Sequence, residues 1–215
     1  MSGGWSEADM ARRVALEFED GACVNLGFGL PILVGGFIPA ERTVFLHSEN
    51  GIIGMGPDAT VATFDPDVVN ASKKPVTLIL GAAIVHQADS FSLIRGGRLG
   101  YSVLGALQVS ARGDIANWRV PGAKGVGGVG GAMDLAVGAR KVFVMMRQTD
   151  KEGRSKLMAD CSFPLTGVRC VDKVFTDLGV IDCSDDGFVV RELAPDITPS
   201  DMRAAVAGPV RFALE

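Results

Sequence analysis

The sequence is poor in the residue types from which metal centres and disulfide frameworks are built. Its 215 residues include only two histidines and four cysteines, and the cysteines are irregularly spaced at Cys23, Cys161, Cys170 and Cys183, with no C-x-x-C pair. Zinc sites are normally built from closely spaced cysteines and histidines, so we expect no metal site. Free thiols without a disulfide pattern are typical of the reducing cytoplasm, and we expect a cytoplasmic protein.

Long runs of charge and of apolar residues are also missing. The formal net charge is −4, and no basic run is longer than two residues, as in Lys73-Lys74, which argues against a nucleic-acid partner. No stretch approaches the roughly 20 apolar residues that cross a bilayer. The N-terminal residues 1–5 lack the basic and apolar segments of a signal peptide. We therefore expect neither a membrane nor a nucleic-acid partner.

Glycine, in contrast, is abundant. It makes up 28 of the 215 residues, whereas its usual share is about 7%. The glycines gather between apolar runs, which indicates turns and loops where the backbone can approach a ligand closely. The chain length favours a single domain over residues 1–215.

The spacing of the apolar residues predicts an α/β protein. A capping box at Ser6-Glu7-Ala8-Asp9 begins a helix whose apolar face holds Met10, Val14 and Phe18 and which ends at Gly21. Similar patterns predict strands at 22–26, 43–46, 76–80, 142–146, 174–176, 180–181 and 188–190, and helices at 32–37, within 81–95, at 132–139 and after Thr198.

These elements imply an arrangement in space. A right-handed β-α-β unit would make the first two strands parallel, so that the glycine-rich loops 25–29 and 49–56 share one cleft. The near-continuous apolar run 76–80 is typical of a strand buried on both faces. We expect the strands after residue 174 to form a final antiparallel portion.

One acidic residue stands at the end of a predicted strand. Ser48-Glu49-Asn50-Gly51 directly follows the apolar segment 44–46. Ligands in α/β proteins bind beyond the carboxyl ends of the strands, so a carboxylate there is approachable. The alternative is a capped turn in which Glu49 is merely solvated. These four residues alone leave both interpretations open.

A second glycine cluster, residues 125–131, precedes a predicted helix. With Asp150 twenty residues beyond Gly130, it satisfies the dinucleotide-binding pattern G-x-G-x-x-G. That fold requires a buried strand directly before the first glycine, whereas residues 118–124 contain a proline and two cations, so we disfavour it. The same glycines could direct backbone N–H groups at a negative charge. They could also simply let the helix pack closely.

Taken together, the motifs resemble the β (B) subunits of the family I coenzyme A transferases. The matching segments are Val24-Asn25-Leu26-Gly27 with Leu30-Pro31, Ser48-Glu49-Asn50-Gly51, Ala88-Asp89-Ser90-Phe91, Arg95-Gly96-Gly97, Leu104-Gly105-Ala106, Ala116-Asn117-Trp118, Gly130-Gly131-Ala132-Met133-Asp134-Leu135 and Pro164-Leu165-Thr166-Gly167. They occur in the family's order from about residue 10 to residue 193. Many independent motifs in order make this resemblance specific.

The resemblance implies a fold and a chemistry. The fold is a three-layer α/β/α arrangement around a mainly parallel sheet, with a short antiparallel C-terminal portion. Glu49 would be the nucleophile that becomes a glutamyl-CoA thioester, with the Gly130 amide and Asn25 at the reacting carboxyl. The residues expected to contact the coenzyme A thioester, a co-substrate and not a tightly bound cofactor, are Asn50, Gly51, Gly27, Gly29, Gly128 and Gly131.

The resemblance also implies substrates and a partner. His47, His86 and the segment 142–146 look most like the 3-oxoadipate branch, with succinyl-CoA as donor, while the acetoacetate and acetate branches stay open. We interpret both histidines as ordinary hydrogen-bonded residues in preference to proton shuttles. An α subunit of similar fold would complete the site, giving αβ or (αβ)2 assemblies. A CoA-thioester hydrolase, a non-catalytic acyl-CoA-binding module and a nicotinamide-dependent oxidoreductase are the alternatives.

Departures from the family pattern concern substrate choice and loop geometry. The segment 59–64 stands where the family usually carries a pair of glutamates. Gly127-Gly128 is an additional pair in the glycine loop, and Ile32 follows Pro31 where threonine is common. None of these changes the residue expected to be the nucleophile.

Overall fold

The computed structural model describes residues 3–122, 124 and 127–214. Its strands are β1 (Cys23–Leu26), β2 (Phe45–Ser48), β3 (Ile52–Asp58), β4 (Val76–Ile84), β5 (Tyr101–Leu104), β6 (Gln108–Ser110), β7 (Ile115–Ala116), β8 (Lys141–Met145), β9 (Leu157–Met158), β10 (Lys173–Thr176), β11 (Gly179–Asp182), β12 (Phe188–Leu193) and β13 (Val210–Phe212). Its helices are α1 (Glu7–Ala15), the 3-10 helix η1 (Leu30–Phe37), α2 (Gln87–Arg95), α3 (Ala132–Gly138) and α4 (Pro199–Ala204).

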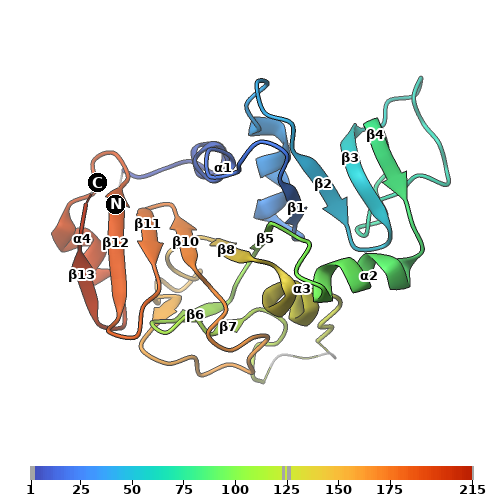
Figure 1. Ribbon diagram of the computed structural model, residues 1–215. Coiled ribbons are helices and arrows are strands. Elements are labelled where there is room, and N and C mark those ends of the chain that lie inside the picture. Colours follow the sequence, from blue (N-terminus) through green and yellow to red (C-terminus); the bar gives the residue numbers. More distant parts are fainter. Residues whose placement is uncertain (1–2, 123, 125–126, 215) are drawn as a thin grey trace.

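A ten-stranded sheet organises the fold, in the order β13-β12-β11-β10-β8-β5-β1-β2-β3-β4 (Figure 1). From β10 through β8, β5 and β1 to β2 every neighbouring pair is parallel. On one side β10, β11 and β12 are antiparallel, which confirms the expected C-terminal portion. On the other side β2, β3 and β4 form a second antiparallel portion, which the sequence did not predict.

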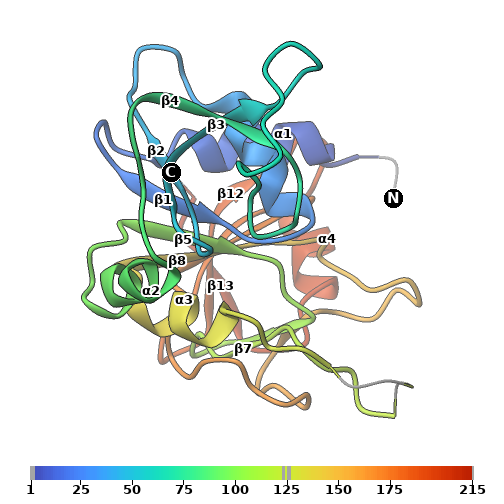
Figure 2. The same ribbon diagram turned by 90° about the vertical axis from the view of Figure 1, so that its right-hand side faces the viewer.

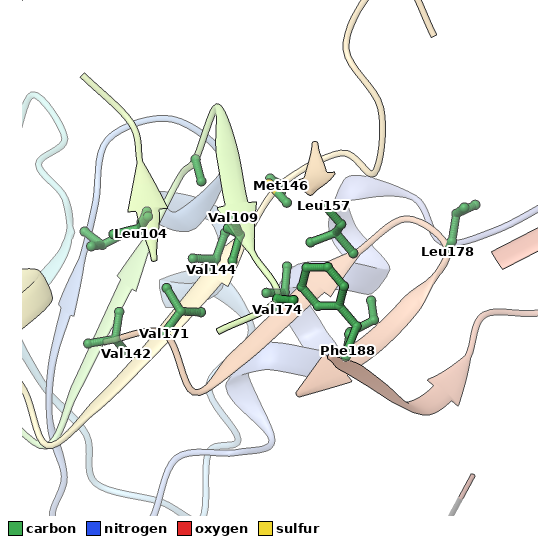
Figure 3. Close-up of a cluster of buried hydrophobic side chains, with 14 of the residues drawn as sticks. Leu104, Val109, Val142, Val144, Met146, Leu157, Val171, Val174, Leu178 and Phe188 are labelled. Carbon is green, nitrogen blue, oxygen red and sulfur yellow. The ribbon is translucent and has the colours of Figure 1, made fainter. Parts of the chain in front are cut away.

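The two faces of the sheet carry separate hydrophobic cores, because successive side chains of a strand point to opposite sides. On β8, Phe143 and Met145 pack with α1 and η1, whereas Val142 and Val144 pack with α2, α3, α4 and the small sheet β7-β6-β9. Figure 2 shows these two layers above and below the strands, and Figure 3 shows part of the second core. The expected three-layer α/β/α arrangement is confirmed. Within the described ranges, no helix is both long and apolar enough to cross a membrane.

The apolar run in β4 was misread. The sequence predicted a strand buried on both faces, but β4 lies at the edge of the sheet, where Leu80 is fully exposed and Ile84 largely so. An apolar run indicates a β-strand but does not specify which strand pairs with which, because pairing depends on residues distant in the chain. The predicted loop 49–56 was also wrong in part, since β3 begins at Ile52.

Two helices differ from their predictions in extent or type. The capping box of Ser6 and Asp9 is present, but α1 ends at Ala15 and not near Gly21. Phe18 nevertheless stays buried in the core, so its spacing reflected burial and not helix length. The segment 32–37 is part of the 3-10 helix η1, and its glycine pair 35–36 accounts for this because glycine disfavours the α-helix.

Prediction for the core: a row of aromatic rings crosses the first face of the sheet. The ring centroids of Phe18, Tyr101, Phe143 and Phe175 follow one another at 5.2, 5.4 and 5.4 Å. Because Phe143 contacts two of these rings, Phe143→Ala should lower the free energy of unfolding by about 3–5 kcal/mol in urea titrations. As the control, Phe64→Ala removes a ring that is 57% exposed and should change it by less than about 0.5 kcal/mol. Equal effects of the two variants would refute the assignment.

Candidate active site

A cavity of about 1120 Å³ opens beyond the carboxyl ends of the parallel strands β1, β2 and β5. This is the edge at which α/β proteins bind ligands, because the strand-to-loop segments of several parallel strands meet there. Among its walls are six of the residues that the sequence placed in the site, namely Asn25, Gly27, Glu49, Gly128, Gly130 and Gly131. The structure therefore brings together the two glycine-containing segments that lie farthest apart in the sequence.

The Glu49 carboxylate lies directly against the backbone of Gly131. Glu49 is half-buried in the turn between β2 and β3, and Gly131 is the N-cap of α3. A Cβ added to Gly131 would lie 2.5 Å from Oε2 and 2.8 Å from Cδ of Glu49, so only glycine permits this approach. The Gly131 amide also donates a hydrogen bond to the carboxylate. The side chain is thereby held at the cavity wall.

The surroundings of Glu49 make it more basic than a solvated glutamate. Burial raises the pKa of Glu49, the Gly131 amide opposes this shift, and the nearby negative charge of Asp134 adds to it. Asp134 in turn accepts a hydrogen bond from Arg95 Nε at 2.6 Å, which ties α3 to α2. Carboxylates with perturbed pKa values in a cleft are candidates for chemistry.

A buried polar chain supports the cavity wall at Asn25. In the parallel pairing of β1 with β2, Asn25 lies beside His47, and its Nδ2 donates to His47 O and to Nδ1, each at 3.2 Å. With Nδ1 accepting, the proton is on Nε2, which donates to Ser90 Oγ of α2 at 2.8 Å. All three side chains are at least 96% buried. Burial lowers the pKa of His47 to about 4, so the imidazole is neutral near pH 7.

Both histidines are therefore structural hydrogen-bonding residues, as the sequence predicted. His47 has both ring nitrogens engaged within the fold. His86 is the N-cap of α2, and its Nδ1 accepts the backbone N–H of Ala88 at 3.1 Å. Neither histidine is placed as a proton shuttle by these contacts.

The neighbours of Glu49 in its motif face another loop. Ser48 Oγ accepts the N–H of Ala71 at 2.8 Å, and Asn50 Nδ2 donates to Val69 O at 2.8 Å. Glu49 points to the cavity while the residues on either side of it hold the loop between β3 and β4. Asn50 is exposed and does not line the cavity.

Two further glycines of the predicted site lie outside the cavity wall. Gly51 has a φ of +125°, and a Cβ there would overlap Val85 O, so it makes the tight turn possible. Gly29 has a φ of +91° and is the N-cap of η1. Their positions indicate backbone roles, whereas Gly130, with a φ of +55°, lies in the wall itself.

Asp134 and Ser90 were not singled out by sequence reasoning. Both stand inside matching motifs, but only the packing of α2 and α3 brings them to Glu49 and His47. The dinucleotide-binding alternative lacks its strand, because β7 ends at Ala116 and residues 117–122 contain none. Gly125 and Val126 of that pattern lie outside the described residues. In the part of the chain that is described, no group of three or more His, Cys, Asp or Glu side chains could hold a metal.

Comparison with known proteins gives one consistent result. Residues 8–204 match the family model described as Coenzyme A transferase. Over 192 residues the chain is 50% identical to the β (B) subunit of the 3-oxoadipate CoA-transferase of Pseudomonas putida, covering 89% of this chain and 90% of that protein. It is 46% identical over 194 residues to the mitochondrial succinyl-CoA:3-ketoacid coenzyme A transferase 2 of Homo sapiens, covering 89% of this chain but 37% of that protein.

A solved structure supports the fold. The acyl-CoA transferase YdiF of Escherichia coli O157:H7, solved as the apoenzyme, superposes with a TM-score of 0.76. The match covers 98% of this chain and 43% of that chain at 20% sequence identity. At this identity the likeness concerns the fold alone.

Prediction for the buried chain: His47 makes stability depend on pH. The unfolded state takes up a proton near pH 6.5, whereas folded His47 does so only near pH 4, so the unfolded state binds more protons between these values. Stability from this group is therefore present above about pH 6.5 and falls with decreasing pH, by on the order of 3 kcal/mol. His47→Gln should lose less stability than wild type between about pH 7 and about pH 4.5 in urea unfolding.

The second histidine provides the matched control. His86→Asn keeps an accepting side chain at the N-cap of α2 and leaves His47 intact, so it should retain the wild-type pH dependence. If wild type and His47→Gln lose stability equally over this range, His47 is not held neutral by the fold.

Proposed function

The chain belongs to the coenzyme A transferase family, and from that membership we propose that it is the β subunit of an enzyme that transfers coenzyme A from succinyl-CoA to the carboxylate of 3-oxoadipate. The relatives named for 3-oxoadipate and for 3-ketoacids support a 3-oxoacid as the acceptor. The observation that carries the proposal is the half-buried Glu49 carboxylate, seated on the Gly131 backbone in the cavity wall.

The proposed reaction begins with attack by Glu49. One carboxylate oxygen attacks the thioester carbonyl of succinyl-CoA, the C–S bond breaks, and a mixed anhydride and the CoA thiolate result. The thiolate then attacks the glutamyl carbonyl, which expels succinate and leaves a glutamyl-CoA thioester. The acceptor carboxylate attacks this thioester, again releasing the thiolate, and the thiolate takes the new acyl group and frees Glu49. Donor and acceptor thus react in turn, with ping-pong kinetics.

This sequence needs oxyanion stabilisation more than proton transfer. Its leaving groups, a thiolate and a carboxylate, are stable anions, so no strong general acid is required. The negative charge that develops at each tetrahedral centre is instead stabilised by preorganised N–H donors. We assign this role to the Gly130 amide, with Asn25 at the reacting carboxyl. Support comes from the place of both residues in the cavity wall that contains Glu49.

The tight packing at Glu49 fits the energetics of the proposed steps. A carboxylate whose pKa is raised by burial is a stronger nucleophile than a solvated one, and the Gly131 amide still orients it. His47 is neutral and fully engaged, so its contribution is to fix Asn25. Contacts to the distant parts of coenzyme A can supply binding energy for compression at the reacting centre.

We further propose how the protein is assembled and where it works. Relatives that are named as one subunit of a transferase imply a second subunit, and we propose an α subunit of similar fold in an αβ or (αβ)2 assembly. Residues 1–215 act as one domain that binds coenzyme A only as a co-substrate, without a tightly bound cofactor or metal. Four free cysteines support a cytoplasmic location.

Prediction for the nucleophile: wild type, assembled with its partner subunit and incubated with succinyl-CoA alone, should form a covalent CoA adduct on the peptide containing Glu49. Glu49→Gln removes the anion and should form none by mass spectrometry. Glu49→Asp keeps the charge but withdraws the carboxylate by roughly 1.5 Å, which should lower kcat by about 100-fold.

The exposed Glu41 gives a control for this experiment. Glu41→Gln removes a surface carboxylate and should keep both the adduct and the turnover. An adduct on a residue other than Glu49, or near wild-type turnover of Glu49→Gln, would end the proposal.

Prediction for the carboxylate seat: Gly131→Ala puts a methyl group where the Glu49 carboxylate lies, so the carboxylate must move by about 1 Å. We expect adduct formation to slow by about 100-fold or more, because misplacement on this scale is costly. Gly36→Ala adds the same group at another glycine of the cavity wall, where an added Cβ meets nothing within 4 Å, and should react like wild type. Equal rates for both variants would contradict the assigned seat.

A further inference from the structure

The cavity wall carries a single cationic side chain among the residues that the structure describes. That residue is Lys74, and the acidic side chains of the same wall are Glu49 and Asp58. The proposed substrates bring more than one negative charge into this space, since succinyl-CoA carries a carboxylate remote from its thioester as well as the phosphates of coenzyme A. A desolvated anion requires a cationic or N–H partner. Glu49 and Asp58 repel such a group, so Lys74 is left to attract it.

The position of Lys74 is linked to the nucleophile through the chain. Ser48 and Asn50, on either side of Glu49, bind the backbone of Ala71 and Val69. These two contacts fasten the loop that leads to the lysine on the strand end that carries Glu49. The loop therefore keeps a fixed relation to the reacting carboxylate.

Asn70 shapes the same loop from within. Its Oδ1 accepts the backbone N–H groups of Ser72 at 2.9 Å and of Lys74 at 3.0 Å, and its carbonyl accepts the N–H of Lys73 at 2.8 Å. The resulting turn gives Lys73 a φ of +62°, which is rare for a residue with a side chain. Lys74 lines the cavity as a result, whereas Lys73 does not.

The ammonium group of Lys74 can accept a further anion. Its Nζ pairs with Asp58 Oδ2 at 2.5 Å, but the two side chains are 55% and 61% exposed. Exposed pairs of this kind contribute little, about 0–1 kcal/mol, and an ammonium has three N–H donors. An arriving carboxylate or phosphate can thus share the group with Asp58 or replace it.

We propose that Lys74 binds the second anionic group of the substrate, a group remote from the thioester. This inference rests on the proposed function. The group is either the remote carboxylate of a dicarboxylic acyl chain or a phosphate of coenzyme A. In the first case Lys74 selects dicarboxylic acids, and in the second it holds the co-substrate whatever its acyl group.

Three thioesters distinguish the two sources in the adduct assay, carried out on the assembled enzyme. Succinyl-CoA has both anionic groups, acetoacetyl-CoA lacks the remote carboxylate, and succinyl-pantetheine lacks the phosphates. Lys74→Met should lower the second-order rate constant with succinyl-CoA by about 10- to 100-fold, the range of a lost charge-assisted hydrogen bond. An equal loss with succinyl-pantetheine but not acetoacetyl-CoA identifies the carboxylate. The reverse pattern identifies the phosphate.

Two neighbouring variants sharpen the test. Lys73→Met removes the adjacent charge outside the cavity and should react like wild type, whereas Lys74→Arg should recover most of the rate. The inference is overturned if Lys74→Met matches wild type with all three thioesters, or if Lys73→Met loses as much. Failure of the proposed function would look different, because wild type itself would then form no adduct with any of them.

Discussion

The candidate site depends on the contact between the Glu49 carboxylate and the Gly131 backbone. It joins the end of β2 to the start of α3, and a single added methyl group at residue 131 would overlap the carboxylate. Because the same glycine supplies the N–H that the carboxylate accepts, position and charge stabilisation come from one residue. Everything that places α3 against the strand ends, including the Arg95–Asp134 ion pair, therefore acts on Glu49.

Behind that contact, the parallel register of β1 and β2 fixes the rest of the wall. Pairing Asn25 with His47 puts two polar side chains together inside the fold, where unpaired they would be costly. Ser90 completes the chain of hydrogen bonds, and the neutral imidazole removes the need to bury a charge. A fully satisfied buried network of this kind rigidifies its members. Asn25 is consequently held in one orientation beside the cavity.

The motif around Glu49 separates into three tasks in space. Glu49 faces the cavity, Ser48 and Asn50 fasten the loop that carries Lys74, and Gly51 makes the turn into β3. A contiguous motif in the sequence thus contains residues that act on different parts of the fold. This explains why two of the glycines and the asparagine expected to contact coenzyme A lie outside the cavity wall.

The sequence by itself determined the parallel centre of the sheet, the capped helices, the family and the identity of Glu49 and the glycine loop. These are local patterns or ordered motifs, and burial or capping imposes them on nearby residues. The tertiary structure alone decided that β4 is an edge strand, that Asp134 and Ser90 serve Glu49 and His47, and that Lys74 reaches the cavity. Such contacts join residues far apart in the chain, and no local propensity encodes which distant strand or helix a segment will meet.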